Sequence, residues 1–226
     1  MGAFDWFWKA MGSQSERNDK KSKAIVDEAR SAAEKLAQSD DAAVAQAARD
    51  AVRGGEVADK AQFLGALAVA CERTLGLHPF TVQSQAVLRL LTGDVIQMAT
   101  GEGKTLVGAM AATGFALTGK RVHVVTVNDY LASRDAEWMR PVVEFFGLQV
   151  ASVTEGMSAD ERRAAYAQNI IYAPVNELGF DLLRDNQITK RAQTVQAPGD
   201  VAFVDEAGLG LVVALSLIHL CRCRRR

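Results

Sequence analysis

The sequence is poor in features that would assign it to several protein classes. Its 226 residues include three cysteines and open without a secretory signal, so no disulfide framework is indicated. No apolar run is long enough to span a bilayer. The net charge is -1, so the positive excess typical of nucleic-acid-binding proteins is missing, and we expect no nucleic-acid partner. These absences fit a protein of a reducing, cytosolic compartment.

The first third of the chain is helical in pattern. Residues 1–23 combine an aromatic tip with a polar run, and we expect a mobile terminus; the alternative is a tip that docks on a membrane surface or channel. Residues 24–52 are rich in alanine and spaced charges, which predicts one helix ended by Gly54 and Gly55. Residues 56–75 predict a second helix, stopped by Gly76.

From residue 80 onward, short β-branched runs alternate with helical stretches. This alternation predicts an α/β fold, with a mostly parallel sheet covered by helices on both faces and preceded by the N-terminal helices. The expected strands lie near 94–98, 121–127, 149–153, 169–173 and 200–204. The expected helices lie near 81–92, 103–118, 129–146, 158–168 and 176–186.

The last segment, 208–226, departs from this pattern. It reads GLGLVVALSLIHLCRCRRR, with no charge before Arg222. We expect this segment to be foreign to the native protein, because its composition changes abruptly after VAFVDEA. The alternative is a basic C-terminal anchor.

The stretch MATGEGKT has the pattern of a phosphate-binding loop between a strand and a helix. Two glycines allow the backbone to approach phosphate oxygens, Lys104 can reach the β- and γ-phosphates, and the Thr105 hydroxyl can hold Mg²⁺. The full pattern has glycine where Met98 stands. The candidate phosphate-binding residues are Thr100, Gly101, Glu102, Gly103, Lys104 and Thr105.

Two further features complete a candidate nucleotide site. Asp205 and Glu206 follow an apolar strand. In this position Asp205 can hold Mg²⁺, and Glu206 can orient or deprotonate the attacking water. Gln83 precedes the loop and can read an adenine edge with its amide, while Phe80 can stack on the base.

Five motifs, in order and spacing, resemble those of SecA, the motor of bacterial preprotein export. They are FTVQ, MATGEGKTL, VHVVTVNDYLASRDAEW, NELGFDLLRDN and VDEA, spread over roughly half the chain. The stretches GDVIQMATGEGKT and RDAEW look most like the accessory, second SecA of actinobacteria.

The resemblance implies a helicase-like RecA fold, ATP and Mg²⁺ as cofactors, and Asp205 with Glu206 as the hydrolytic pair. It also implies a SecY-type channel and preproteins as partners, with a cytoplasmic location and peripheral contact at the inner face of the cell membrane. Asn128, Asp129 and Arg184 lie in motifs that the family uses to couple nucleotide state to motion. The implied organisation is a terminal tip (1–23), helices packed on the motor lobe (24–76), an incomplete first nucleotide-binding lobe (77–207) and a foreign tail (208–226).

The chain also departs from the family's motifs. Thr81 stands where the family usually has Asp, His78 where it has Arg, and YAPVNE replaces YGTNNE. Gly208 replaces the final Asp of the DEAD motif. Without a second lobe to supply an arginine finger, we expect this chain to bind ATP but hydrolyse it poorly. The alternatives are a fragment of a nucleic-acid helicase and a non-catalytic nucleotide-binding module.

Overall fold

The computed structural model describes residues 14–188, 193–197 and 199–205, and it divides into two compact units, 1–107 and 108–226. The division falls inside a helix, whereas the sequence suggested a helical part that ends at residue 76. The aromatic tip, Glu206 and the 208–226 tail lie outside the described residues.

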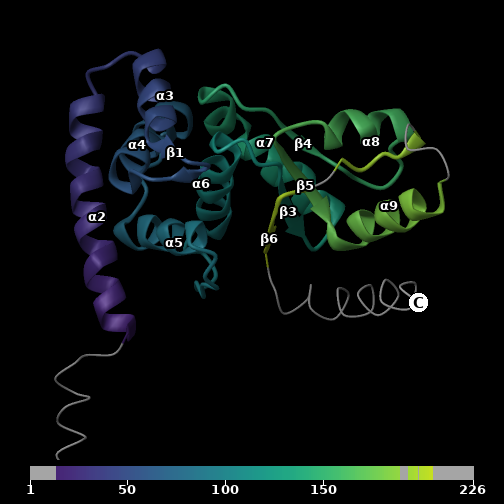
Figure 1. Ribbon diagram of the computed structural model, residues 1–226, viewed down its shortest axis with the longest axis horizontal. Coiled ribbons are helices and arrows are strands. Elements are labelled where there is room, and N and C mark those ends of the chain that lie inside the picture. Colours follow the sequence, from purple (N-terminus) through teal and green to yellow (C-terminus); the bar gives the residue numbers. More distant parts are fainter. Residues whose placement is uncertain (1–13, 189–192, 198, 206–226) are drawn as a thin grey trace, which may run out of the picture. The chain divides into compact units, whose positions relative to one another are not determined.

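The first unit is built mainly of helices (Figure 1). They are α2 (Gln14–Leu36), α3 (Asp41–Asp50), α4 (Lys60–Leu75), α5 (Thr81–Leu91) and the first turn of α6 (Lys104–Leu117). Helix α4 lies at the centre of this unit: its buried residues include Phe63, Leu64 and Leu67, and it packs against both α2 and α3.

The single helix expected over 24–52 is wrong, because the chain breaks between α2 and α3. Asp40 causes the restart: its carboxylate accepts from the Ala43 N–H at 2.7 Å and so caps α3. Helix α2 also begins earlier than expected, at Gln14, since its polar run contains no glycine or proline.

Gly54 and Gly55 do not cap a helix but form the turn of a small hairpin between β1 (Val52–Arg53) and β2 (Glu56–Val57). Both glycines have positive φ, 63° and 78°, as a tight hairpin turn requires. Gly76, by contrast, ends α4 as predicted, and it adopts the left-handed conformation there.

The second unit contains the predicted parallel sheet, with the strand order β4-β5-β3-β6. Its strands are β3 (Val122–Thr126), β4 (Val150–Ser152), β5 (Ile170–Pro174) and β6 (Val201–Val204), and all three pairings are parallel. The expected strand over 94–98 is wrong: this segment pairs with no strand of the described chain, and Val95 is 96% exposed. A short apolar run becomes a strand only where a neighbour pairs with its backbone groups, which no local pattern reveals.

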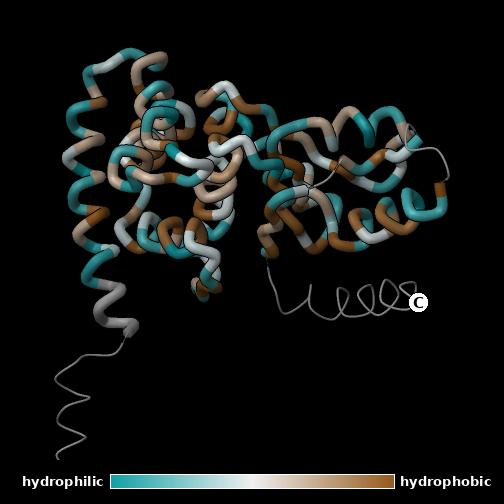
Figure 2. Tube along the Cα trace, in the orientation of Figure 1, coloured by the Kyte–Doolittle hydropathy of each residue, from teal (hydrophilic) through white to brown (hydrophobic). Residues whose placement is uncertain are grey.

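Helices cover both faces of the sheet, as predicted. On one face, α6 and α7 (Asp129–Phe145) pack on a cluster that includes Val124, Ile170 and Tyr172. On the other face, α8 (Ala159–Tyr166) and α9 (Val175–Gln187) pack on a cluster that includes Ile171 and Ala173. Figure 2 shows hydrophobic residues along the strands and mostly hydrophilic residues along α8.

Two glycines inside helices offer a matched test of this packing. An added Cβ at Gly65 of α4 would lie 2.8 Å from the Ala32 Cβ of α2, whereas one at Gly108 of α6 would meet no described atom within 4 Å. We expect Gly65→Ala to lower the free energy of unfolding by about 1–3 kcal/mol through overpacking. Gly108→Ala should raise it by up to about 1 kcal/mol through helix propensity. Urea denaturation of both variants measures the difference, and equal effects would contradict the close α2–α4 contact.

His123 of β3 predicts a pH dependence. Its ring faces Tyr166 with 5.9 Å between centroids, and its Nε2 is buried without a hydrogen-bond partner among the described residues. Burial, and secondarily the charge of Arg121, lowers the pKa of His123, against an opposing effect of Asp200. As the pH is lowered, His123 is therefore protonated in the unfolded chain at a higher pH than in the folded chain. The free energy of unfolding then falls as the pH drops below about 6.5.

The measurement is urea unfolding between pH 7.5 and 5.5. His123→Gln should reduce the loss of unfolding free energy at low pH. For one proton this loss is at most about 1.4 kcal/mol per pH unit. His78→Gln serves as the control, because this histidine side chain is 75% exposed. An unchanged slope in His123→Gln would show that other groups cause the pH dependence.

Candidate nucleotide site

The predicted phosphate-binding loop runs directly into the start of α6. Gly101 and Gly103 have φ of 88° and 80°, a conformation that residues with a Cβ rarely adopt. The Gly103 carbonyl accepts from the Val107 N–H at 3.2 Å, so the helix begins at this glycine. Lys104 and Thr105 are therefore the first two residues of α6, where unpaired N–H groups and the helix dipole favour an anion.

Gln83 connects the start of α5 to this loop. Its Oε1 accepts from the Phe80 N–H at 2.9 Å, and its Nε2 donates to the Glu102 carbonyl at 2.9 Å. A Cβ on Gly103 would collide with the Gln83 amide, so this position requires glycine for space as well as for its φ. The side chain is 6% exposed. The amide that we expected to read adenine is thus engaged with backbone groups, while Phe80 is 70% exposed.

Glu102 folds back over its own loop. Its Oε2 accepts from the Ala99 N–H at 2.6 Å, so one backbone donor of the loop already contacts an anion, the loop's own carboxylate. Thr100 and Gly101 are exposed beside it.

In the second unit, the motif residues gather where the parallel strands end. Asp205 directly follows β6, and its N–H donates to the Val125 carbonyl of β3 at 3.0 Å. Asn128 caps α7 through a 2.9 Å bond from the Leu131 N–H. The neighbouring Asp129 accepts from the Glu155 N–H at 3.2 Å. Asn128 and Asp129 therefore fix the loop between β3 and α7 at the edge where Asp205 lies.

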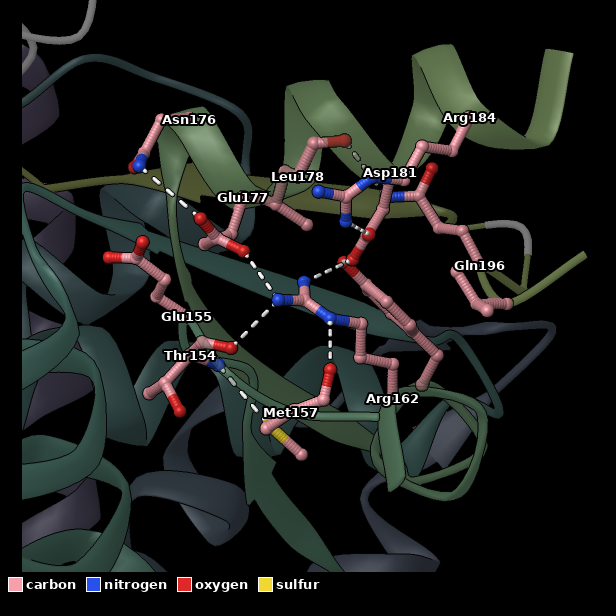
Figure 3. Close-up of polar contacts among 12 residues, drawn as sticks. Thr154, Glu155, Met157, Arg162, Asn176, Glu177, Leu178, Asp181, Arg184 and Gln196 are labelled. Carbon is pink, nitrogen blue, oxygen red and sulfur yellow. Dashed lines mark hydrogen bonds and ion pairs between the residues drawn. The ribbon is translucent and has the colours of Figure 1, made fainter. Parts of the chain in front are cut away.

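The motif NELGFDLLRDN supplies two buried carboxylates, Glu177 and Asp181, to an ion cluster (Figure 3). Arg162 of α8 lies between Glu177 and Asp181 of α9, with N–O distances of 2.7 and 2.8 Å, and also donates to the carbonyls of Thr154 and Met157. Arg162, Glu177 and Asp181 are each at most 5% exposed. This ion cluster joins α8, α9 and the loop after β4.

Two other residues of α9, Arg184 and Asp185, add further contacts. Arg184 contacts Asp181 at 3.1 Å from a more exposed position. Asp185 accepts from the N–H groups of Val195 and Gln196 and holds the returning segment against α9. The polar residues of this motif therefore stabilise the packing of α9.

Sequence reasoning did not find Arg162, although a signal was present. Arg162 shares the inward stripe of α8 with Ala165 and Tyr166, at i, i+3 and i+4. Glu177 and Asp181 repeat the same i, i+4 spacing on α9. An arginine and two carboxylates on apolar helix faces indicate that the three charges are buried together.

The residues proposed to hold Mg²⁺ have the right chemistry, since the Thr105 hydroxyl and the Asp205 carboxylate are hard oxygen donors. The described residues contain no group of three or more His, Cys, Asp or Glu side chains placed to bind a metal unaided. A cation here would depend on nucleotide phosphates for its remaining ligands.

The chain has a parallel sheet with helices on both faces, and a glycine loop followed by a helix that begins with Lys-Thr. These features define a helicase-like α/β fold of the RecA type. A crystal structure of a hypothetical ATP-dependent RNA helicase from Sulfolobus tokodaii has this fold, with a TM-score of 0.53 over 70% of this chain and 46% of that one. The two sequences are 21% identical, so the likeness extends to the fold alone.

The chain belongs to the SecA family, because the SecA DEAD-like domain matches residues 7–212. The match includes the start of the 208–226 segment that we expected to be foreign. The chain is 62% identical to protein translocase subunit SecA 2 of Corynebacterium glutamicum, over 94% of this chain and 28% of that protein. It is 50% identical to SecA 2 of Mycolicibacterium smegmatis, over 91% of this chain and 26% of that one. The resemblance to SecA, and to its second actinobacterial form, is confirmed; the chain spans about a quarter of these relatives.

The ion cluster predicts a large effect of one substitution. Arg162→Met should lower the free energy of unfolding by about 3–5 kcal/mol, because Glu177 and Asp181 would remain buried without their partner. Arg163→Met is the matched control: its ion pair with Asp160 is largely exposed and should contribute at most about 1 kcal/mol. Urea denaturation of both variants measures the contrast. A loss below about 1 kcal/mol for Arg162→Met would contradict the cluster's structural role.

Proposed function

We propose that this chain is the ATP-binding part of a SecA-type motor, in which ATP hydrolysis drives preproteins through a SecY-type channel. The observation that carries the proposal is the loop of Gly101 and Gly103 at the start of α6, with Lys104 and Thr105 following it. Membership of the SecA family supports it, since relatives of 50–62% identity are named protein translocase subunits.

In this proposal each residue has a distinct task. The N–H groups at the start of α6 and the Lys104 ammonium bind the phosphates, and Thr105 and Asp205 hold Mg²⁺, which would neutralise developing charge on the transferred phosphoryl group. Glu206 orients or deprotonates the attacking water. Phe80 and Gln83 bind the adenine, for which the Gln83 amide must exchange at least one of its two backbone bonds.

The location follows from the same proposal. Among the described residues, no helix is both long and apolar enough to cross a bilayer. We propose that the protein works from the cytoplasm and contacts the inner face of the cell membrane through its channel partner. The alternative of a nucleic-acid helicase gains no support from the Sulfolobus structure, whose likeness is confined to the fold.

Nucleotide binding by the 226-residue chain tests the proposal. A fluorescent ATP analogue should bind in the presence of Mg²⁺, and Lys104→Ala should weaken this binding by at least about tenfold through loss of a charge-assisted contact. Lys60→Ala is the matched control, because Lys60 is likewise the first residue of a helix, α4, but follows no phosphate-binding loop. Equal binding by the two variants would contradict the assignment of the loop.

Steady-state hydrolysis distinguishes a motor part from a complete enzyme. An arginine from a second lobe contributes roughly 10³ to 10⁵ in rate in related phosphoryl transfers, so we expect turnover by this chain near background. Turnover at about 1 s⁻¹ or faster, removed by Lys104→Ala, would overturn that expectation. Lack of turnover on addition of the remaining part of a SecA 2 relative would favour a non-catalytic nucleotide-binding module.

A further inference from the structure

Tyr172 carries a polar group that the fold itself does not use. The residue lies in the middle of β5 and is 2% exposed. Its hydroxyl is buried and has no hydrogen-bond partner in the described part of the chain. Buried hydroxyl groups are nearly always paired, since an unpaired one opposes folding. Phenylalanine would fill the same space without this unpaired group, so the tyrosine points to a role for its hydroxyl.

The register of the sheet places Tyr172 on the same face as Phe203, which lies two residues before Asp205. Tyr172 is paired with Val124 of β3, and Val124 is paired with Phe203 of β6. Asp205 directly follows β6, and its N–H still bonds the Val125 carbonyl of β3. Since side chains two residues apart on a strand share a face, Asp205 continues the row that Phe203 begins. The carboxylates that act on the hydroxyl are those of Asp135 and Asp205: after burial, they are the causes that raise the pKa of Tyr172.

The two carboxylates differ in how far they are already satisfied. Asp135 of α7 is 3% exposed, and its Oδ1 accepts from Arg134 at 2.6 and 2.8 Å. Asp205 is half-buried, and its carboxylate forms no ion pair with any residue that the structure describes. A hydroxyl donor interacts more favourably with a carboxylate that has no cationic partner than with one that is already paired, so Asp205 is the better acceptor for Tyr172.

We propose that Tyr172 is a positioning residue for Asp205: when a nucleotide is bound, its hydroxyl donates a hydrogen bond to the Asp205 carboxylate, which the fold alone does not form, and holds it in the orientation that would bind the Mg²⁺ of that nucleotide. No proton is transferred, and Tyr172 touches neither nucleotide nor cation. This inference rests on the proposed nucleotide-binding function. It adds a residue to that site which lies in no phosphate-binding or acidic motif.

The test compares Tyr172→Phe with Tyr166→Phe in the 226-residue chain. Both tyrosines are buried, but the Tyr166 hydroxyl donates to Asp181 at 2.9 Å in the ion cluster on the other face. The affinity for a fluorescent ATP analogue is measured with Mg²⁺ and with EDTA, and the urea midpoint is measured for each variant. The unsubstituted chain should bind more tightly with Mg²⁺.

Tyr172→Phe should reduce the Mg²⁺-dependent gain in affinity by about tenfold, the effect of one hydrogen bond to a charged group. Its affinity in EDTA should stay unchanged, and its urea midpoint should not fall, because no hydrogen bond of the fold is lost. Tyr166→Phe should keep the Mg²⁺ effect and lower the midpoint.

Three results would count against the inference. If Tyr172→Phe keeps the full Mg²⁺ effect, or loses affinity equally with Mg²⁺ and EDTA, the positioning role is wrong while nucleotide binding stands. If the unsubstituted chain binds no nucleotide, the proposed function fails and this inference fails with it.

Discussion

The parallel pairing of β3 with both β5 and β6 is the constraint on which the second unit depends. Parallel strands run the same way, so the segments that leave them emerge at one edge of the sheet. This brings Asn128 and Asp129, the start of α9, and Asp205 to a common edge, although more than 70 residues separate the first from the last. Each connection must also return along a face of the sheet, and so both faces are covered by helices.

Because helices cover both faces of the sheet, some charged side chains of this unit are buried, and they are stabilised by charges of opposite sign beside them. Arg162, Glu177 and Asp181 form one ion cluster between α8 and α9. It links the two helices by directional ion pairs in addition to side-chain packing. Unlike an apolar contact, the hydrogen bonds of this cluster are directional, so they restrict how α8 and α9 pack against each other. The motif NELGFDLLRDN is thus explained largely by packing within the unit.

The sequence was sufficient for the elements that a local pattern determines. Helices α5 to α9 and strands β3 to β6 lie within a few residues of their predicted bounds, because their periodicity and their caps, such as Asn128, are local. The break before Asp40, the Gly54-Gly55 hairpin and the missing strand at 94–98 depend instead on which distant segments pack or pair. For the candidate site, the pattern predicted the glycine loop and Asp205, and their roles stay predictions. It did not reveal that Gln83 is engaged with backbone groups or that Tyr172 shares a face with Asp205, since both facts depend on tertiary register.

The contact between Glu102 and the Ala99 N–H gives the loop an internal competitor. An incoming phosphate that uses this N–H must displace a tethered carboxylate, whose effective concentration is set by three residues of chain and not by the solution. The measured affinity for an anion that uses this N–H would then equal its intrinsic affinity multiplied by the fraction of time that Glu102 is away. If the loop binds phosphate as proposed, a ligand of low charge would rarely win this exchange, and the tethered carboxylate would favour polyphosphates over singly charged anions.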